Sequence, residues 1–463
     1  MKRTTTPELL VLTALSALSH FWRLFTPNAV VFDELHYKHF AGHYLQHTFY
    51  FDVHPPLANL LYALVAHVAG VSADTLLGNA PVTILRVLPA FCGTLLVPLG
   101  YAILRQLGAR RRVATLAGLA LLAENALLVD TRFTLVEPLI LSSGLAALSL
   151  DLAARRSMGA SRWALLAASA LFAGAALSFK WTGASALGII LTLWAVDVWK
   201  ERRVSPRAMG EASLLAGVPI VVYVVTFAVH FALLTHVGVG EAAMSASFRN
   251  TLIGWPQYDS TAHMSLAAKI ADIHGVMNRG NRELEYATHP ASSPWYTWPI
   301  MKHPIALWEN EAAGAGRKQM IVLLGNPVLW WGGMLGVVFA AGMLLRRRSR
   351  SPERQFALAF LLGAFAIDFV PFMFITRLMY IYHYLFALVF AVLLGAYVLG
   401  SAAGWNDGDD ALFRFESARS ARLYWGVVAL IIVAFAYFSP LSYGWTISQR
   451  AFDNRFWVLH PHL

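Results

Sequence analysis

The apolar run VTILRVLPAFCGTLLVPLGYAIL, residues 82–104, is followed by the basic segment RQLGARRR, residues 105–112, a pattern typical of a membrane-spanning helix. Its first part is long enough to cross a bilayer, which takes roughly 20 apolar residues. The basic part marks the side where that span ends, because cytoplasmic loops are rich in Lys and Arg. We therefore predict an all-α polytopic membrane protein of about 11 transmembrane helices. The ten other predicted spans lie near residues 4–25, 113–129, 134–152, 163–179, 182–198, 212–235, 319–345, 355–375, 379–402 and 422–440.

The composition excludes an ordinary water-soluble protein. Of the 463 residues, 57% are hydrophobic and only 13% are charged, and the mean hydropathy is +0.55. The formal charge of +10, from 36 Lys and Arg against 26 Asp and Glu, would suit a nucleic acid. Membrane proteins collect such charges for orientation alone, so we expect no nucleic-acid partner. The single cysteine, Cys92, lies in an apolar run and leaves the chain without an internal disulfide.

The basic turns predict the orientation of the chain. The apolar run Leu57–Gly70 has only about 14 residues, so we interpret it as an interfacial or re-entrant helix in a polar loop that stays on one side. The span at 82–104 then runs inward, and the later basic turns also fall inside. These turns are Arg155/Arg156/Arg162, Lys200–Arg207 and Arg346–Arg354. We predict a cytoplasmic N-terminus and an extracytoplasmic C-terminus.

Three regions follow from this topology. Residues 1–235 form an N-terminal transmembrane module that includes a first extracytoplasmic loop, 26–81, with interfacial helices. Residues 236–318 form a second extracytoplasmic loop, and residues 319–463 supply the C-terminal transmembrane helices. The first apolar run, with Ala17-Leu18-Ser19 near its end, also resembles a cleavable signal peptide, although we favour a retained helix.

Ionisable residues gather at the predicted outer membrane surface, where each costs free energy unless it is paired or faces a wet cavity. Cations at headgroup depth suit a phosphate, and neighbouring carboxylates suit a proton acceptor. Single members have structural ion pairing as the simpler explanation, but the whole set predicts a charged cavity for a phosphorylated lipid. The set comprises Asp33, Glu34, Asp52, His54, Arg86, Glu124, Asp130, Arg132, Glu137, Lys180, Asp368, Arg377 and His383.

Four histidines recur at three- and four-residue spacing in the first outer loop: His36, His39, His43 and His47. On a helix they would lie along one face. Imidazoles with a carboxylate nearby are good Zn²⁺ ligands, so a metal site is one interpretation. The favoured one is an interfacial helix, because aromatic residues accompany the histidines.

The same residues resemble the protein O-mannosyltransferase family, a member of the GT-C class of lipid-linked glycosyltransferases. The signature is Phe32-Asp33-Glu34-Leu35-His36-Tyr37, followed by Asp52-Val53-His54-Pro55-Pro56-Leu57. Further matches keep the family's order along the chain. They are Leu85-Arg86, Ala123-Glu124-Asn125, Thr131-Arg132-Phe133, Glu137-Pro138, Phe179-Lys180-Trp181-Thr182-Gly183, Thr288-His289-Pro290, Ser293-Pro294-Trp295-Tyr296-Thr297-Trp298-Pro299, Gly325-Asn326-Pro327, Trp330-Trp331, Arg377 and Tyr382-His383-Tyr384.

The resemblance implies an inverting transferase that moves mannose from polyprenyl- or dolichyl-phosphate mannose to Ser or Thr hydroxyls of proteins. It implies that Asp33 is the catalytic base, that Glu34 is a second essential carboxylate, and that Arg86 holds the donor phosphate. The weaker assignments to donor binding rest on motif position and topology; they are His54, Arg132, Lys180, Arg377 and His383.

The sequence departs from the family pattern at two places. Eukaryotic members carry a β-trefoil MIR domain where this chain has residues 236–318, and Glu137 stands where many relatives have Asp. We therefore expect a compact bacterial type without the MIR domain, in the bacterial inner membrane. Its partners would be a polyprenyl-phosphate mannose donor, membrane lipid and unfolded or translocating acceptor proteins, with a dimer as one option. No cofactor or metal is required, because a cationic site stabilises a leaving phosphate directly.

Two alternatives stay open. A related GT-C transferase would move another sugar, such as aminoarabinose, from polyprenyl phosphate to a lipid. A transporter or flippase for a lipid-linked anion would use the same cations but would not need Asp33 to accept a proton.

Overall fold

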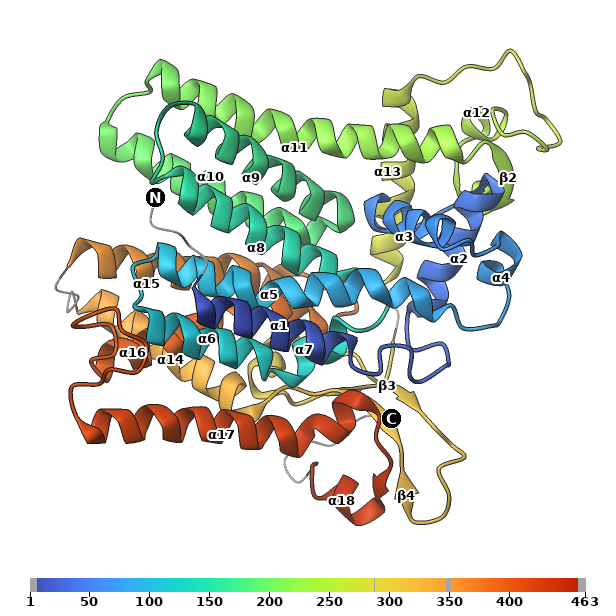
Figure 1. Cartoon of the computed structure of the whole chain (residues 1–463). Helices are drawn as coiled ribbons and strands as arrows, with labels where there is room; N and C mark the ends of the chain where they lie inside the picture. Colours follow the sequence, from blue (N-terminus) through green and yellow to red (C-terminus); the bar gives the residue numbers. More distant parts are fainter. Residues whose placement is uncertain (1–5, 287, 347–350, 457–463) are drawn as a thin grey trace.

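The computed structural model describes residues 6–286, 288–346 and 351–456 and consists mainly of long helices. Figure 1 shows these helices running side by side. Within the described residues, nine helices are long and apolar enough to cross a membrane, which confirms the helical membrane fold. They are Thr83–Gln106 (with α5), Glu137–Ala154 (α8), Gly159–Phe179 (α9), Trp181–Glu201 (with α10), Pro206–Leu233 (α11), Pro327–Leu345 (α14), Pro352–Phe374 (with α15), Ile381–Ala402 (with α16) and Ala418–Tyr443 (α17).

The two other predicted spans form shorter helices. The first is α1, Pro7–Phe21, which packs against α5 and α6. Its Glu8 is buried and accepts hydrogen bonds from Arg111 at 2.6 Å and from Tyr101 at 2.8 Å. Such contacts fit a first helix that belongs to the bundle. The other span, predicted near residues 113–129, is interrupted, because α6 (Arg111–Leu122) ends before the span is complete and α7 runs from Asn125 to Asp130. The count of 11 spans stays a prediction.

The predicted span at 319–345 was wrong in its first part. Met320–Leu323 forms a buried strand, β5, and α14 begins only at Pro327. The side chain of Asn326 caps this helix by accepting a hydrogen bond from the Val328 N–H at 3.1 Å, and Pro327 follows at the first helical position. A short apolar run does not distinguish a strand from a helix, which explains the error.

The first long loop contains the helices expected there. These are α2 (Glu34–Gln46), α3 (Leu57–Val68) and α4 (Ala73–Leu77), and α2 packs against the other two. The strand β1 (Thr48–Tyr50) pairs in parallel with β2 (His236–Val239) of the second long loop. This pairing joins two segments that lie far apart in the sequence. Figure 1 shows both loops at one end of the long helices.

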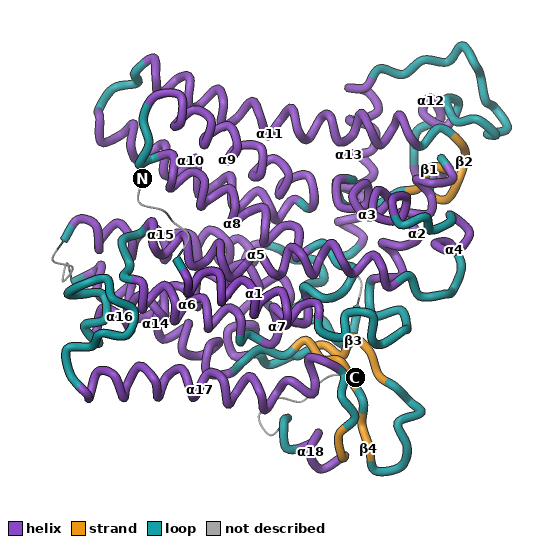
Figure 2. The backbone as a smooth tube through the Cα atoms, in the orientation of Figure 1, coloured by secondary structure: helices purple, strands orange, loops and turns teal. Residues whose placement is uncertain are grey.

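The second long loop contains one extended helix, α13 (Leu266–Glu283), and several short elements. The strand β3 (Ile305–Glu309) pairs with β5, and β4 (Arg317–Lys318) pairs with β6 (Ile447–Ser448). Figure 2 shows all these strands at the same end as α2 and α3. The other short elements of this loop are η3 (Glu241–Ala243), α12 (Ala246–Arg249) and η4 (Trp295–Ile300), and the short helix α18 (Gln449–Asp453) follows α17.

The long helices differ in how deeply they are enclosed. The spans that contain α8 and α16 are each 78% buried, whereas those that contain α10 and α11 are only 22% buried. The enclosed helices begin at the end that carries the loops. The single turn η6 (Ile381–Tyr384) precedes α16 (Leu385–Ala402) there. The core of the bundle therefore anchors residues that face the loops.

Candidate active site

Asp33 lies at the N-cap of α2, where the chain turns sharply into the helix. The preceding Phe32 adopts φ +50°, a left-handed conformation that is strained for an aromatic residue. Its ring meets the ring of Tyr382 edge-on, with the two ring centroids 6.3 Å apart. Asp33 is half-buried and lines a cavity of about 290 Å³ together with Asp52 and His54. Burial is the main cause that raises the pKa of Asp33, and the negative charge of Glu137 adds to the rise. A carboxylate with a raised pKa is suited to accept a proton.

Glu34 does not line this cavity and forms a buried ion pair with Arg86. Two parallel hydrogen bonds of 2.8 Å join their side chains, and both residues are buried. Arg86 also donates to the carbonyl oxygens of Leu24, Pro27 and Ala29. All five N–H groups of the guanidinium are thus used within the protein. The pair fixes the loop that leads to Asp33.

Arg132 occupies a second buried position in which carbonyl oxygens surround the guanidinium. It donates to the carbonyls of His20, Trp22, Arg23 and Ser442, and the guanidinium carbon lies 4.6 Å from the ring centroid of Tyr443. Burial lowers the pKa of Arg132 to about 10, which leaves the side chain charged at neutral pH. Arg132 therefore ties the end of α1 to the end of α17.

A larger cavity, of about 580 Å³, collects three of the expected donor-binding residues: Lys180, Arg377 and His383. The Lys180 ammonium donates to Glu137 at 2.7 Å and lies 5.3 Å from the ring centroid of Tyr382. Arg377 donates to the amide oxygen of Asn281 at 2.7 Å. The cavity is thus lined by two cations and by the carboxylates of Glu137 and Asp368, with apolar residues between them.

His54 lies between the two cavities. It lines the smaller one with Asp33, and the charges of Lys180 and Arg377 act on it from the larger one. Burial, followed by repulsion from these two cations, holds the pKa of His54 well below its usual value. The imidazole is therefore neutral at neutral pH and offers one donor and one acceptor. The two cavities are neighbours that share one electrostatic environment.

Asp52 lines the smaller cavity and stabilises the turn of the Asp52-Val53-His54 segment. Its carboxylate accepts hydrogen bonds from the His54 N–H at 3.1 Å and from the Asn59 side-chain amide at 2.8 Å. Burial raises the pKa of Asp52 to about 6, and these hydrogen bonds limit the rise. Asp52 holds the backbone turn that presents His54.

The remaining outer charges have separate places. Glu124 is buried at the break between α6 and α7, where it accepts from the Leu127 N–H at 2.6 Å and from the Asn326 N–H at 2.8 Å. Asp130 is buried at the end of α7, and Asp368 lines the larger cavity. The expected charged cavity therefore contains only part of the set.

The histidine-rich segment does form a helix, α2, but its histidines make different contacts. The ring of His36 stacks on Phe40, and that of His43 stacks on Tyr50, while His47 follows the helix in a left-handed conformation. In the part of the chain that the structure describes, no group of three or more His, Cys, Asp or Glu side chains is arranged to hold a metal ion.

Three residues that line the larger cavity or contact its side chains received no role in the sequence analysis. Asn281, from α13, accepts the hydrogen bond of Arg377, and nothing in its local sequence marks it. Trp298 stacks on His383 with ring centroids 5.9 Å apart, and Tyr382 lies beneath Lys180. The last two belong to quoted motifs, so the motif positions were a usable signal for them.

Comparison with known proteins identifies relatives along most of the chain. The model of the dolichyl-phosphate-mannose-protein mannosyltransferase family matches residues 10–235, and that of the C-terminal four-transmembrane region of protein O-mannosyltransferases matches residues 266–460. Protein O-mannosyltransferase 1 of Drosophila melanogaster is 31% identical over 275 residues, which cover 56% of this chain and 30% of that protein. Dolichyl-phosphate-mannose–protein mannosyltransferase 1 of Saccharomyces cerevisiae is 33% identical over 246 residues, 49% of this chain and 30% of that protein. The matched part spans about a third of the length of these relatives.

Solved structures share the fold. The Pmt1–Pmt2 protein O-mannosyltransferase complex of S. cerevisiae, bound to its sugar donor, contains a chain that superposes with a TM-score of 0.88 at 18% identity, covering 99% of this chain and 93% of the other. The oligosaccharyltransferase of Archaeoglobus fulgidus superposes with a TM-score of 0.54 at 16% identity, covering 97% of this chain and 57% of the other. At these identities the likeness shows the fold alone.

Proposed function

The chain belongs to the dolichyl-phosphate-mannose–protein mannosyltransferase family, and from this premise we propose that it transfers mannose from polyprenyl-phosphate mannose to Ser or Thr hydroxyls of proteins. One observation carries the proposal. A half-buried carboxylate with a raised pKa, Asp33, adjoins a cavity lined by two cations, Lys180 and Arg377. Such a pairing of proton acceptor and phosphate-binding cations is what transfer from a lipid phosphate requires.

The larger cavity is the proposed place of the donor headgroup. Lys180 supplies a compact positive charge and Arg377 a planar fork of donors, and both suit phosphate oxygens. Apolar side chains such as Ile140, Leu141 and Phe372 line the rest of the cavity, where the first isoprene units would pack. His383, stacked on Trp298, would contact the phosphate or the sugar.

The smaller cavity is the proposed place of the acceptor hydroxyl. Asp33 accepts the hydroxyl proton while the oxygen attacks the anomeric carbon from the face opposite the phosphate. The bond between that carbon and the phosphate oxygen breaks, its electron pair goes to the phosphate, and the configuration inverts. Lys180 and Arg377 stabilise the phosphate charge that develops, so the leaving group needs no strong acid.

The geometry favours positioning roles for Glu34, Arg86 and Arg132. All five donors of Arg86 are used within the protein. We therefore propose that this arginine holds Glu34 and the loop before Asp33 and does not bind the donor phosphate. Arg132 would hold the ends of α1 and α17 in the same way. His54 would orient substrate as a neutral imidazole between the cavities.

The setting follows from the membrane fold. The chain is an integral membrane protein, and we propose that the site faces the extracytoplasmic side of a bacterial inner membrane, with the N-terminus inside and the C-terminus outside. The acceptors would be unfolded or translocating proteins, since a hydroxyl has to reach Asp33. The similar yeast protein is a two-chain complex, which supports a partner chain for this one as well.

The direct test measures transfer of mannose from polyprenyl-phosphate mannose to a Ser/Thr peptide by the purified chain and by Asp33→Asn. We expect kcat to fall about 10²- to 10⁴-fold, the usual contribution of a general base, with unchanged thermal unfolding. Asp74→Asn, an exposed aspartate of α4, is the matched control. Near-normal turnover of Asp33→Asn would remove Asp33 as the base.

A cellular test separates this function from transfer to a lipid. Mass spectrometry of extracytoplasmic proteins should show hexose on Ser/Thr peptides in cells with the intact chain and its loss with Asp33→Asn. Unchanged protein glycosylation with an altered glycolipid profile would instead favour the related sugar transferase.

A further inference from the structure

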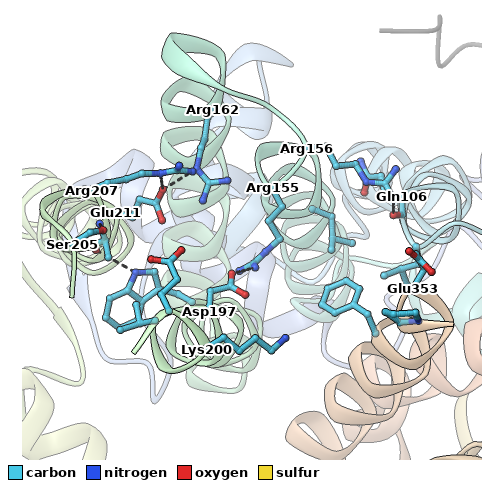
Figure 3. A pocket seen from close by; sticks show the side chains of 18 of the residues that line it. Gln106, Arg155, Arg156, Arg162, Asp197, Lys200, Ser205, Arg207, Glu211 and Glu353 are labelled. Atoms are coloured by element: carbon cyan, nitrogen blue, oxygen red, sulfur yellow. Dashed lines mark hydrogen bonds and ion pairs between the residues drawn. The ribbon is translucent and has the colours of Figure 1, made fainter. Parts of the chain in front are cut away.

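A third cavity, of about 1240 Å³, lies at the end of the bundle opposite Asp33. The ends of α5, α8 and α10 and the beginnings of α9, α11 and α15 line it. Figure 1 shows these helix ends on the side away from α2 and α3. The proposed transfer reaction uses none of its residues. Figure 3 shows its labelled side chains surrounding the hollow. Six cations line it: Arg155, Arg156, Arg162, Lys200, Arg203 and Arg207.

Three of these cations are partly neutralised by carboxylates. Arg162 and Arg207 donate to the same oxygen of Glu211, at 2.8 and 2.9 Å, as drawn in Figure 3. Arg155 bonds to Asp197 and also to Asp151, on its own helix. Each guanidinium has five donors, and these contacts leave several of them free for another acceptor.

The other three cations keep their charge. In the described part of the chain, no carboxylate lies within ion-pair distance of Arg156, Lys200 or Arg203. Arg156 donates only to the carbonyl oxygen of Gln106. Burial, and next the positive charge of Arg105, lower the pKa of Arg156, as expected in a positive environment. Two exposed carboxylates, Glu201 and Glu353, also line the cavity and only partly offset this charge.

The neighbouring part of the same end is arranged differently. Arg105 pairs with Asp410, Arg111 with Glu8, and Arg354 with Asp407. A bias of Lys and Arg toward one side of the membrane orients the chain whether or not these residues converge. Orientation alone does not require six cations to converge on one hollow, so this convergence calls for a further explanation.

A second hollow, which shares Lys200 and Arg203 with this cavity, suits the depth of lipid headgroups. Trp199 is 77% exposed and Val204 is 61% exposed, both beside Lys200 and Arg203. Tryptophan is enriched where the hydrocarbon of a membrane meets water. The adjoining helices α10 and α11 are the least buried spans, so the hollow opens beside the lipid-facing surface.

We propose that this cavity binds the phosphate of an anionic phospholipid from the adjacent leaflet. The free donors of Arg156, Lys200 and Arg203 would contact phosphate oxygens, and Trp199 would pack against the glycerol and the upper acyl chains. Basic pockets between transmembrane helices bind anionic headgroups through the same chemistry.

Native mass spectrometry of the full chain in detergent tests the proposal. The protein is titrated with phosphatidylglycerol, phosphatidylcholine or glycerol phosphate. We expect phosphatidylglycerol to be retained in preference to the other two. The double variant Lys200→Ala/Arg203→Ala should bind phosphatidylglycerol about 30-fold more weakly, since each surface cation contributes about fivefold.

The matched control is Arg419→Ala/Arg422→Ala, which removes the same charge from exposed positions of α17 outside the cavity. It should retain phosphatidylglycerol like the unaltered chain. Equal weakening in both double variants, or equal retention of phosphatidylglycerol and phosphatidylcholine, would overturn the proposal. Retention of glycerol phosphate as strong as that of the lipid would show a site for free phosphate and would also overturn it.

Discussion

Two arginines at the end of the bundle that carries the long loops show how burial decides what a cation does. Arg86 has all five donors satisfied, by Glu34 and by three carbonyl oxygens. Arg377 makes one hydrogen bond within the described residues, to Asn281, and lines the larger cavity. Arg86 therefore stabilises the loop at Asp33, whereas Arg377 has donors that remain unused at the cavity.

Arg86→Ala should lower the free energy of unfolding by about 3–5 kcal/mol, because it leaves the buried Glu34 carboxylate without its partner. Arg377→Ala should leave thermal unfolding in detergent nearly unchanged and raise the KM for the donor about 10- to 100-fold, the effect of losing a charged hydrogen bond. Initial rates at varied donor concentration, measured also for the milder Arg86→Lys, distinguish the two. A large rise in donor KM for Arg86→Lys without lost stability would restore the phosphate-binding role.

The raised pKa of Asp33 makes a prediction about pH. Asp33 accepts a proton only when ionised, so kcat should fall as the pH falls through its pKa, which lies above the ordinary value of 3.8. Glu137→Gln removes the negative charge that, after burial, raises this pKa most. The ionised form of Asp33 becomes more favourable, and its pKa decreases.

The acid limb of the kcat profile should therefore shift to lower pH in Glu137→Gln. Glu283→Gln, at an exposed carboxylate at the end of α13, is the control and should leave the limb in place. An acid limb that moves to higher pH, or does not move, would contradict the assignment of this limb to Asp33.

Among the helices, the break between α6 and α7 is stabilised by specific hydrogen bonds of Glu124. Glu124 caps α7 and also accepts from the backbone of Asn326, so one carboxylate joins α7 to the start of α14. Gly325 makes this approach possible. A Cβ there would lie 2.0 Å from the ring of Trp330 and 2.8 Å from the Glu124 carboxylate. The interruption of the predicted span thus links two parts of the chain.

Glu124→Ala should lower the free energy of unfolding by about 2–4 kcal/mol, since two buried N–H groups would lose their acceptor. Thermal unfolding in detergent measures the change, with Glu283→Ala as an exposed control. A variant as stable as the control would mean that water replaces the carboxylate, and Glu124 would not be the joint between α7 and α14.

At the scale of the whole molecule, the two ends of the bundle use charge for different purposes. The end with the loops combines Lys180 and Arg377 with the carboxylate of Asp33 across neighbouring cavities. At the opposite end several arginines pair with carboxylates, and in the described part of the chain Arg156, Lys200 and Arg203 line one hollow without such a partner. Both ends present positive charge where lipid phosphates lie.

Because fixed cations line the proposed donor cavity, a chelator should leave the transfer rate unchanged within about twofold. The measurement compares initial rates before and after dialysis against EDTA, with the donor held at saturation. A complete loss of activity that Zn²⁺ or Mn²⁺ restores would revive a metal site at the histidine-rich helix α2.

The apolar runs and basic turns were sufficient to predict a helical membrane protein, because spanning a bilayer constrains length and hydropathy directly. The motifs were sufficient to identify the family. The other features depend on contacts between residues far apart in the sequence, which local patterns do not predict. Examples are the parallel pairing of β1 with β2, the hydrogen bond from Arg377 to Asn281, and the hydrogen bond from the Asn326 N–H to Glu124.

The apolar runs predicted most of the long helices, and the free-energy cost of a bare charge at the membrane implied that the polar residues beside them need partners. The identity of each partner depends on contacts between segments that lie far apart in the sequence. Lys180 and Arg377 face a cavity, while Arg86 and Arg132 are enclosed by carbonyl oxygens from other segments. The physical reason is that a buried charge must be satisfied locally, and the groups that satisfy it come from distant parts of the chain that folding alone brings together.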